Sequence, residues 1–154
     1  MNNQNIRALL RGDLDRVSYL VDINAMFPSE MLTDMTAPFF DGDESQRWLV
    51  YDDRQVDAVC YFVPEGLADG VWNLLMIAVD PGRHGQGLGT KLMRAAEQQL
   101  AQEGVRLLLV DTSGKDEFKR TRSFYDMLGY EHEARIRDYW AEGDDKVTFR
   151  KRLT

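Results

Sequence analysis

The fold of this protein is decided by residues 74–90, which read LLMIAVDPGRHGQGLGT. The segment Val71–Val79 is largely apolar on both faces and is predicted to be a central β-strand. Beyond Pro81-Gly82, which ends the strand, three glycines stand at alternate positions: Gly85, Gly87 and Gly89. Four apolar residues then recur at the spacing of an amphipathic helix: Leu88, Leu92, Ala96 and Leu100. The order strand, glycine loop, helix predicts an α/β fold.

A glycine loop in this position is suited to binding an anion. Glycine has no Cβ, so its backbone N–H groups can approach a ligand closely. The first turn of the following helix adds N–H groups without intrahelical partners and the positive end of the helix dipole. Phosphate or pyrophosphate is the anion that such a site fits best. The alternative is a tightly packed strand–helix turn that binds nothing.

Two common phosphate-binding motifs do not match this loop. The P-loop needs Gly-x-x-x-x-Gly-Lys-Ser/Thr, and here Lys91 follows Thr90, so the register fails. The dinucleotide fingerprint needs Gly-x-Gly-x-x-Gly, and Gly85 and Gly87 supply its first pair, but position 90 is a threonine. Asp111 stands where a ribose-binding acid would stand, yet too little chain follows for a doubly wound sheet.

The rest of the chain alternates between strands and helices. Six further strands are expected, at Ile6–Leu10, Trp48–Tyr51, Val56–Val63, Val105–Val110, Glu131–Tyr139 and Lys146–Leu153. Three further helices are expected: one with Asp13 as N-cap, one that opens at Pro28-Ser29 and stops near Pro38, and one over about Asp116–Leu128. An acidic turn, Gly143-Asp144-Asp145, would join the last two strands. With no linker visible, residues 1–154 are predicted to form one mixed α/β domain.

Composition excludes several classes of function. The chain has 154 residues, with 19 Lys and Arg against 26 Asp and Glu, a net charge of −7. This balance disfavours nucleic-acid binding and permits a cationic substrate. No apolar run is long enough for a membrane helix and no signal peptide is visible, so a cytoplasmic location without membrane attachment is expected. The lone Cys60 is expected in the core, and with the two histidines far apart no metal site is expected.

The glycine loop and two other segments resemble the GNAT N-acetyltransferases. The frame His84–Gly89 is similar to the family signature Q/R-x-x-G-x-G/A, with His84 in place of the usual Gln or Arg. Leu75–Pro81 looks like the family's fourth strand, and Thr121–Tyr130 looks like its fourth helix. The resemblance covers essentially the whole chain. It implies a mixed, mostly antiparallel sheet of about six to seven strands flanked by about four helices.

The resemblance also implies that acetyl-CoA is the co-substrate. Backbone amides of the glycine loop and helix start would hold its pyrophosphate, and the residues concerned are His84, Gly85, Gln86, Gly87, Leu88, Gly89 and Thr90. Ile77, Ala78 and Val79 would pair with the pantetheine arm through their backbone. The amide of Ile77 would polarise the acetyl carbonyl, an oxyanion-type role.

Acetyl transfer to an amine needs a proton acceptor and a proton donor. Tyr125 matches the tyrosine that often serves as the acid in the family, and the alternative is a core tyrosine with a hydrogen-bonded hydroxyl. Some members place a glutamate on the fourth strand, and Asn73 stands there in this chain, where it cannot accept a proton. Others place an acid at the end of the fifth strand, and Asp111 matches that position as candidate base. The alternative for Asp111 is a turn residue that orients Thr112–Gly114.

The acceptor is expected to be a primary amine of a small molecule or a peptide. Aromatic and acidic residues, with one methionine, could frame it through cation–π contacts, ion pairs and packing; they are Phe27, Met31, Phe39, Phe40, Tyr139, Trp140, Asp144 and Asp145. Ordinary packing is the alternative for this set. The function expected from the resemblance is direct acetyl transfer from acetyl-CoA to that amine. The alternative is a non-catalytic acyl-CoA sensor or partner module on the same fold, and a homodimer is left open.

Overall fold

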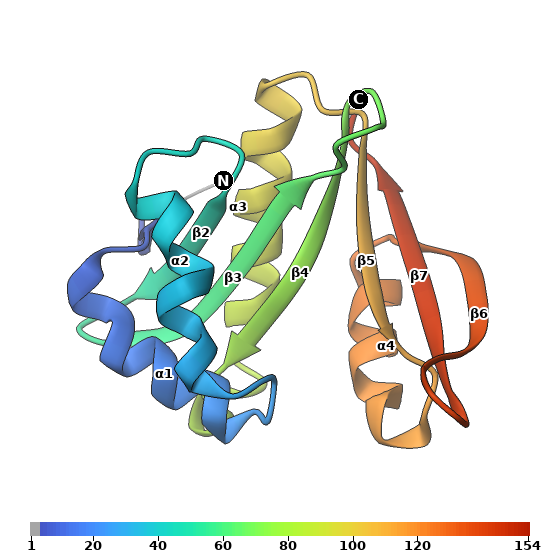
Figure 1. Cartoon of the computed structure of the whole chain (residues 1–154), viewed down its shortest axis with the longest axis horizontal. Helices are drawn as coiled ribbons and strands as arrows, with labels where there is room; N and C mark the ends of the chain where they lie inside the picture. The colour runs from blue at the N-terminus through green and yellow to red at the C-terminus, as the bar shows by residue number, and fades with distance from the viewer. Residues whose placement is uncertain (1–3) are drawn as a thin grey trace. The chain divides into compact units, whose positions relative to one another are not determined.

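The computed structural model describes residues 4–154. Seven strands lie in this part of the chain: β1 (Ile6–Ala8), β2 (Arg47–Asp52), β3 (Val56–Pro64), β4 (Val71–Val79), β5 (Leu107–Ser113), β6 (Glu131–Ala141) and β7 (Asp144–Arg152). The α-helices of the same part are α1 (Leu14–Ile23), α2 (Leu32–Phe40), α3 (Leu88–Gln102) and α4 (Lys119–Met127) (Figure 1). None of the described helices is both long enough and apolar enough to cross a membrane.

The strands follow the order β1-β2-β3-β4-β5-β7-β6 in the sheet. The ladder between β4 and β5 is parallel, whereas the β1–β2, β2–β3, β5–β7 and β6–β7 ladders are antiparallel. The parallel ladder is short, because it joins Val71–Leu74 to Leu107–Val110 and ends there. The predicted fold class, a mixed and mostly antiparallel sheet with four helices, is therefore confirmed.

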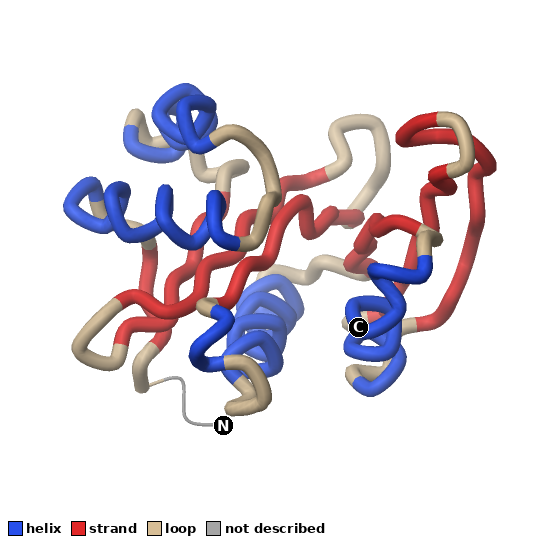
Figure 2. The backbone as a smooth tube through the Cα atoms, turned by 90° about the horizontal axis from the view of Figure 1, so that it is seen from below, coloured by secondary structure: helices blue, strands red, loops and turns tan. Residues whose placement is uncertain are grey.

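The chain forms two compact units. The first comprises the described residues up to Val63 together with Leu75–Gln99, and the second comprises Pro64–Leu74 with Leu100–Thr154. Within the first unit, α1 and α2 cover one face of the strands and α3 covers the other (Figure 2). Whether residues 1–154 act as a single domain stays a prediction.

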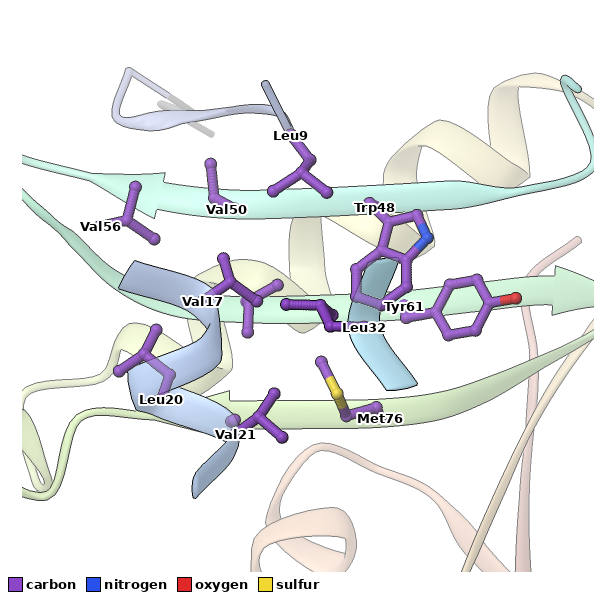
Figure 3. Close-up of a cluster of buried hydrophobic side chains, with 12 residues drawn as sticks. Leu9, Val17, Leu20, Val21, Leu32, Trp48, Val50, Val56, Tyr61 and Met76 are labelled. Carbon is purple, nitrogen blue, oxygen red and sulfur yellow. The ribbon is translucent and has the colours of Figure 1, made fainter. Parts of the chain in front are cut away.

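The core of the first unit lies under α1 and α2. Helical spacing brings Val17, Leu20 and Val21 onto the inner face of α1, and all three are fully buried. Trp48 of β2 stacks on Tyr61 of β3 with ring centroids 4.2 Å apart (Figure 3). The burial of these apolar surfaces is the main source of stability for this unit.

One helix end and one cap interaction differ from the sequence prediction. The helix α2 continues through Pro38 to Phe40 instead of stopping near the proline. Proline removes only one N–H group, and the turn is closed by bonds from Asp41 N–H to the Ala37 carbonyl (2.9 Å) and from Asp43 N–H to the Pro38 carbonyl (3.0 Å). Asp13 is the N-cap of α1, but its carboxylate accepts the Leu10 N–H instead and makes no cap bond.

Strand ends differ as well. β1 ends at Ala8 and not at Leu10, whereas β5 extends to Ser113, so Asp111 lies inside the strand and not after it. The β6–β7 turn is tighter than predicted and comprises Glu142 and Gly143. Asp144 therefore already belongs to β7 and pairs with Ala141 across the hairpin. Gly143 has a φ of +80°, which permits this short turn.

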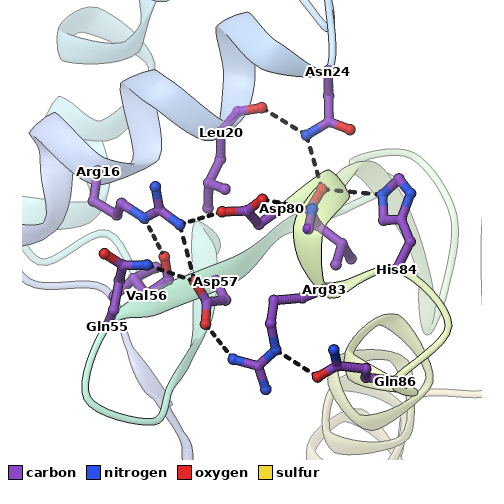
Figure 4. Close-up of polar contacts among 12 residues, drawn as sticks. Arg16, Leu20, Asn24, Gln55, Val56, Asp57, Asp80, Arg83, His84 and Gln86 are labelled. Atoms are coloured by element: carbon purple, nitrogen blue, oxygen red, sulfur yellow. Dashed lines mark hydrogen bonds and ion pairs between the residues drawn. The ribbon is translucent and has the colours of Figure 1, made fainter.

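A buried carboxylate connects α1, β3 and the segment that enters the glycine loop. Asp57 of β3 is 4% exposed, and its carboxylate accepts hydrogen bonds from Arg16 (2.9 Å), Gln55 (3.0 Å) and Arg83 (2.5 Å) (Figure 4). Its backbone carbonyl accepts the Asp80 N–H at 2.8 Å. A buried carboxylate is tolerated because guanidinium groups compensate its charge.

We predict that Asp57→Asn lowers the free energy of unfolding by about 2 kcal/mol or more, because it removes the charge that both arginines contact. Urea unfolding measures the change. Glu131→Gln is the matched control, since Glu131 is 65% exposed where it pairs with Arg150 and should lose at most about 0.5 kcal/mol. Equal losses in the two variants would contradict a structural role for Asp57.

Cys60 is fully buried in β3, as the sequence predicted. Burial raises the pKa of its thiol to about 12. We therefore predict that a disulfide reagent at pH 8 labels Cys60 only after denaturation, because the thiolate is the reactive form. Rapid labelling of the folded protein, followed by absorbance, would show that β3 opens or that the thiol is activated.

Candidate functional site

The glycine loop connects β4 to α3 through two residues in the left-handed region. Gly85 has a φ of +79° and Gly87 a φ of +78°, which only glycine adopts readily. A Cβ at either position would have no atom within 4 Å apart from its chain neighbours. The loop is thus shaped by its backbone conformation and leaves open space beside both glycines.

The start of α3 presents backbone N–H groups next to this loop. The Lys91 N–H donates to the Gly87 carbonyl at 3.0 Å, and this bond opens the helical ladder. The N–H groups of Leu88, Gly89 and Thr90 precede that ladder, as in the first turn of any α-helix. The helix dipole adds positive potential at the same end. The chemistry of this segment suits a phosphate or pyrophosphate group.

The segment before the loop is held by Asp80. Its carboxylate accepts the Gly82 N–H at 2.9 Å and a hydrogen bond from Arg16 at 2.5 Å. The Gly82 N–H, followed by Arg16, holds the pKa of Asp80 below its ordinary value. The carboxylate therefore stays ionised to lower pH than an ordinary aspartate, and the short helical turn Pro81–Arg83 keeps its cap.

Two side chains already contact the carbonyl oxygen of Val79, at the end of β4. The Val79 carbonyl accepts Asn24 Nδ2 at 3.0 Å, and His84 Nε2 lies 3.3 Å from the same oxygen (Figure 4). His84, which replaces the usual Gln or Arg of the signature, thus lies against the strand end. A pantetheine arm that paired with Val79 would use its N–H group and not its carbonyl. Ile77 and Ala78 lie beyond Leu74, where the ladder to β5 ends.

Tyr125 lies in the second unit, on the inner face of α4. It is 3% exposed and packs against Phe149 of β7, with ring centroids 5.6 Å apart, and against Tyr130 at 5.9 Å. Phe149 pairs with Val110 in the antiparallel ladder. Tyr125 therefore lies on the face of β5 that Val110 occupies.

Asp111 lies on the opposite face of β5, because adjacent residues of a strand point to opposite sides. Its Oδ1 accepts the Thr148 hydroxyl at 2.7 Å, and its Oδ2 accepts Asn73 Nδ2 at 3.3 Å. Lys146 Nζ lies 3.9 Å from the same Oδ2. The carboxylate thus contacts the neighbouring strands β4 and β7 and not residues 112–114, which the sequence had suggested as a turn. There the Ser113 hydroxyl instead contacts Asp144 and Lys115.

Asn73 and Glu65 complete this polar cluster. Asn73 is 7% exposed, and its Nδ2 donates to Glu65 Oε1 at 3.0 Å as well as to Asp111. Its Oδ1 is buried and has no hydrogen-bond partner. Glu65 was not predicted from the sequence. The one feature that could have indicated it is its position, a carboxylate just after β3 in the loop that leads to β4.

The residues expected to frame an acceptor are distributed over both units. Phe27, Phe39 and Phe40 are partly buried against the core of the first unit, whereas Met31 is exposed. In the second unit, Tyr139 and Trp140 are exposed and meet edge to face at 4.8 Å. The two aspartates are already engaged, Asp144 by Ser113 and Asp145 by Arg135. A cationic acceptor would have to compete for both carboxylates.

Each unit thus brings together part of the predicted site. The first holds Ile77–Val79 and the glycine loop with the start of α3, and the second holds Tyr125 and Asp111. Within residues 4–154, no three His, Cys, Asp or Glu side chains gather in a way that could hold a metal ion.

Comparison with solved structures places this fold among acetyltransferases. A GNAT-family protein from Desulfovibrio desulfuricans is 25% identical with a TM-score of 0.88, covering 97% of this chain and 98% of its own. The ribosomal-protein-S18-alanine N-acetyltransferase of Escherichia coli is 19% identical with a TM-score of 0.79, over 97% and 93% of the two chains. A Salmonella typhimurium protein solved with its cofactor acetyl-CoA is 15% identical with a TM-score of 0.76, over 99% and 95%.

A search among curated proteins found no match to this chain. The sequence profile described as the acetyltransferase (GNAT) family matches residues 14–130. That span includes β4, the glycine loop, α3, β5 and α4, which carry every residue predicted to bind the coenzyme or to transfer a proton. The chain therefore belongs to the GNAT acetyltransferase family.

Proposed function

We propose that this protein transfers the acetyl group of acetyl-CoA to a primary amine. The observation that carries the proposal is the arrangement of Gly85 and Gly87, both left-handed and unobstructed, before the N-terminus of α3. Their backbone would admit the pyrophosphate of the coenzyme to N–H groups of the loop and helix start, and the pantetheine arm would pair with Ile77–Val79. The acetyl-CoA in the Salmonella typhimurium neighbour supports this choice of donor.

The reaction needs two proton transfers, and two side chains are proposed for them. The amine attacks the thioester carbonyl, whose developing negative charge the Ile77 N–H would stabilise. Asp111 accepts a proton from the amine, and Tyr125 protonates the leaving thiolate. Because the two side chains lie on opposite faces of β5, each would serve a different partner, the amine or the thiol. Cys60 is fully buried with a raised pKa, so direct transfer is favoured over a cysteine intermediate.

The acceptor is proposed to be a small molecule or a peptide with a primary amine. The net charge of −7 favours a cation over an anion as substrate. The Escherichia coli neighbour, which acetylates an alanine of a ribosomal protein, supports an amine acceptor. A cytoplasmic location fits a chain whose one cysteine has no internal partner for a disulfide.

Release of free thiol from acetyl-CoA with a panel of primary amines tests the proposed function. Amine-dependent release supports catalysis. Calorimetric binding of CoA without release by any amine would instead favour the non-catalytic acyl-CoA-binding module. Failure to bind CoA would contradict both.

We predict that Gly87→Val weakens CoA binding by tenfold or more, because it places a side chain in the open space beside the loop. Isothermal calorimetry measures the affinity. Gly104→Val is the matched control, since Gly104 has a φ of +82° and an equally open surrounding at the end of α3. Both variants should lose stability through backbone strain. Only Gly87→Val should lose affinity, and an unchanged affinity there would remove the loop from the coenzyme site.

We predict that Tyr125→Phe lowers kcat by roughly 10²–10⁴-fold, because it removes the proton donor and keeps the ring that packs on Phe149. CoA affinity should stay the same. Tyr130→Phe removes a hydroxyl from the adjacent buried ring and should leave kcat unchanged. Similar kcat values for both variants, with acetyl transfer shown to be rate-limiting, would leave Tyr125 as a packing residue.

A further inference from the structure

We propose that Glu65, Asn73 and Asp111 form the binding site for the ammonium group of the acceptor, and that Glu65 determines its selectivity for primary amines. This inference rests on the proposed function and adds a residue to it. Glu65 lies in the loop between β3 and β4, outside the segments that carry the family resemblance.

The side-chain amide of Asn73 connects Glu65 and Asp111 by hydrogen bonds. Asn73 Nδ2 donates to Glu65 Oε1 at 3.0 Å and to Asp111 Oδ2 at 3.3 Å, so both hydrogens of the amide are used. The backbone holds Glu65 beside the start of β4, because its N–H donates to the Val71 carbonyl at 2.8 Å. The two carboxylates are thereby fixed on either side of Asn73.

The oxygen of the same amide is a hydrogen-bond acceptor without a donor. Asn73 Oδ1 is buried and has no hydrogen-bond partner, and the whole residue is only 7% exposed. A buried polar atom without a partner is unfavourable, and a donor that reaches it gains more than a donor at the surface. Since Nδ2 points to the two carboxylates, the donor that completes Oδ1 would lie in the same cluster.

The charges of the cluster select a cation. Glu65 and Asp111 contribute two negative charges, and Lys146, 3.9 Å from Asp111, contributes one positive charge. Lys146 also lies over the Tyr139 ring, with Nζ 4.2 Å from its centroid. One negative charge remains without a neutralising partner inside the cluster, which an alkylammonium group would supply.

A primary ammonium group matches this site in the number of its donors. It carries three N–H groups, and the cluster offers three acceptors: the Glu65 carboxylate, Asn73 Oδ1 and the Asp111 carboxylate. A secondary ammonium has two N–H donors and a quaternary ammonium has none. The site therefore selects primary amines by hydrogen bonding as well as by charge.

The reaction balances with these groups. The bound ammonium gives up one proton, which leaves to water through the exposed Glu65 side of the cluster. The neutral amine then forms the C–N bond while the C–S bond of the thioester breaks. A second proton leaves the nitrogen to Asp111, and Tyr125 protonates the thiolate. Solvent then removes the proton from Asp111 and returns one to Tyr125, which restores both side chains. The sum is an ammonium and acetyl-CoA giving an amide, CoA thiol and one proton.

Binding can be tested without turnover, by following the side-chain amide of Asn73 in ¹H–¹⁵N spectra. The probe is n-butylammonium chloride, with tetramethylammonium chloride as a cation of the same charge that has no N–H donor. The Asn73 signals, assigned by their loss in Asn73→Ser, should shift with butylammonium and not with tetramethylammonium. No shift with butylammonium, or equal shifts with both cations, would overturn the proposal.

Glu65→Gln tests the contribution of the negative charge alone, because glutamine keeps an oxygen that can accept the hydrogen bond from Asn73. It should need about tenfold more butylammonium for the same shift, as expected for loss of one charge-assisted hydrogen bond. Asp69→Asn removes a carboxylate from the same exposed loop and should behave as the wild type. Equal titrations of the two variants would remove Glu65 from the site.

Steady-state kinetics distinguishes failure of the ammonium site from failure of the proposed acetyl transfer. For an amine that the wild type acetylates, Glu65→Gln should raise KM about tenfold, with kcat and CoA affinity nearly unchanged. An unchanged KM would overturn the binding role of Glu65. If the wild type neither binds CoA nor releases thiol, the proposed function fails, and the titration alone decides the ammonium site.

Discussion

The carboxylate of Asp57 is the interaction on which the first unit depends. One buried charge joins α1 through Arg16, β3 through its own backbone, and the entry to the glycine loop through Arg83. The conformation of the loop follows from its glycines, but its attachment follows from this network. A loop that must present backbone N–H groups to an anion gains from such an anchor, because its geometry is fixed before a ligand arrives.

In the second unit, the alternation of β5 places the two proposed catalytic side chains on opposite faces of the strand. Val110 faces Phe149 and Tyr125, whereas Asp111 faces Thr148 and Asn73. On two faces, Tyr125 and Asp111 contact different neighbours, as the proposed roles of a proton acceptor for the amine and a proton donor for the thiolate require.

Asn73 connects two carboxylates of the second unit although it carries no charge itself. An amide on β4 cannot accept a proton, yet it can hold two carboxylates through its two hydrogens. The two negative charges beside it come from the loop before β4 and from β5. The Asn73 amide thus positions the carboxylates of Glu65 and Asp111.

The sequence by itself determined the features that depend on local order. Apolar period, the glycine spacing and the signature at His84–Gly89 predicted the strands, the helix α3 and the family, because these patterns act over a few residues. It misplaced the end of α2 and the position of Asp111 in β5, since packing and cross-strand hydrogen bonds set those boundaries. Only the tertiary structure brought Glu65 to Asn73 and Asp57 to Arg16 and Arg83. Their hydrogen bonds join different elements, and no periodicity along one segment encodes which polar side chains will meet when those elements pack.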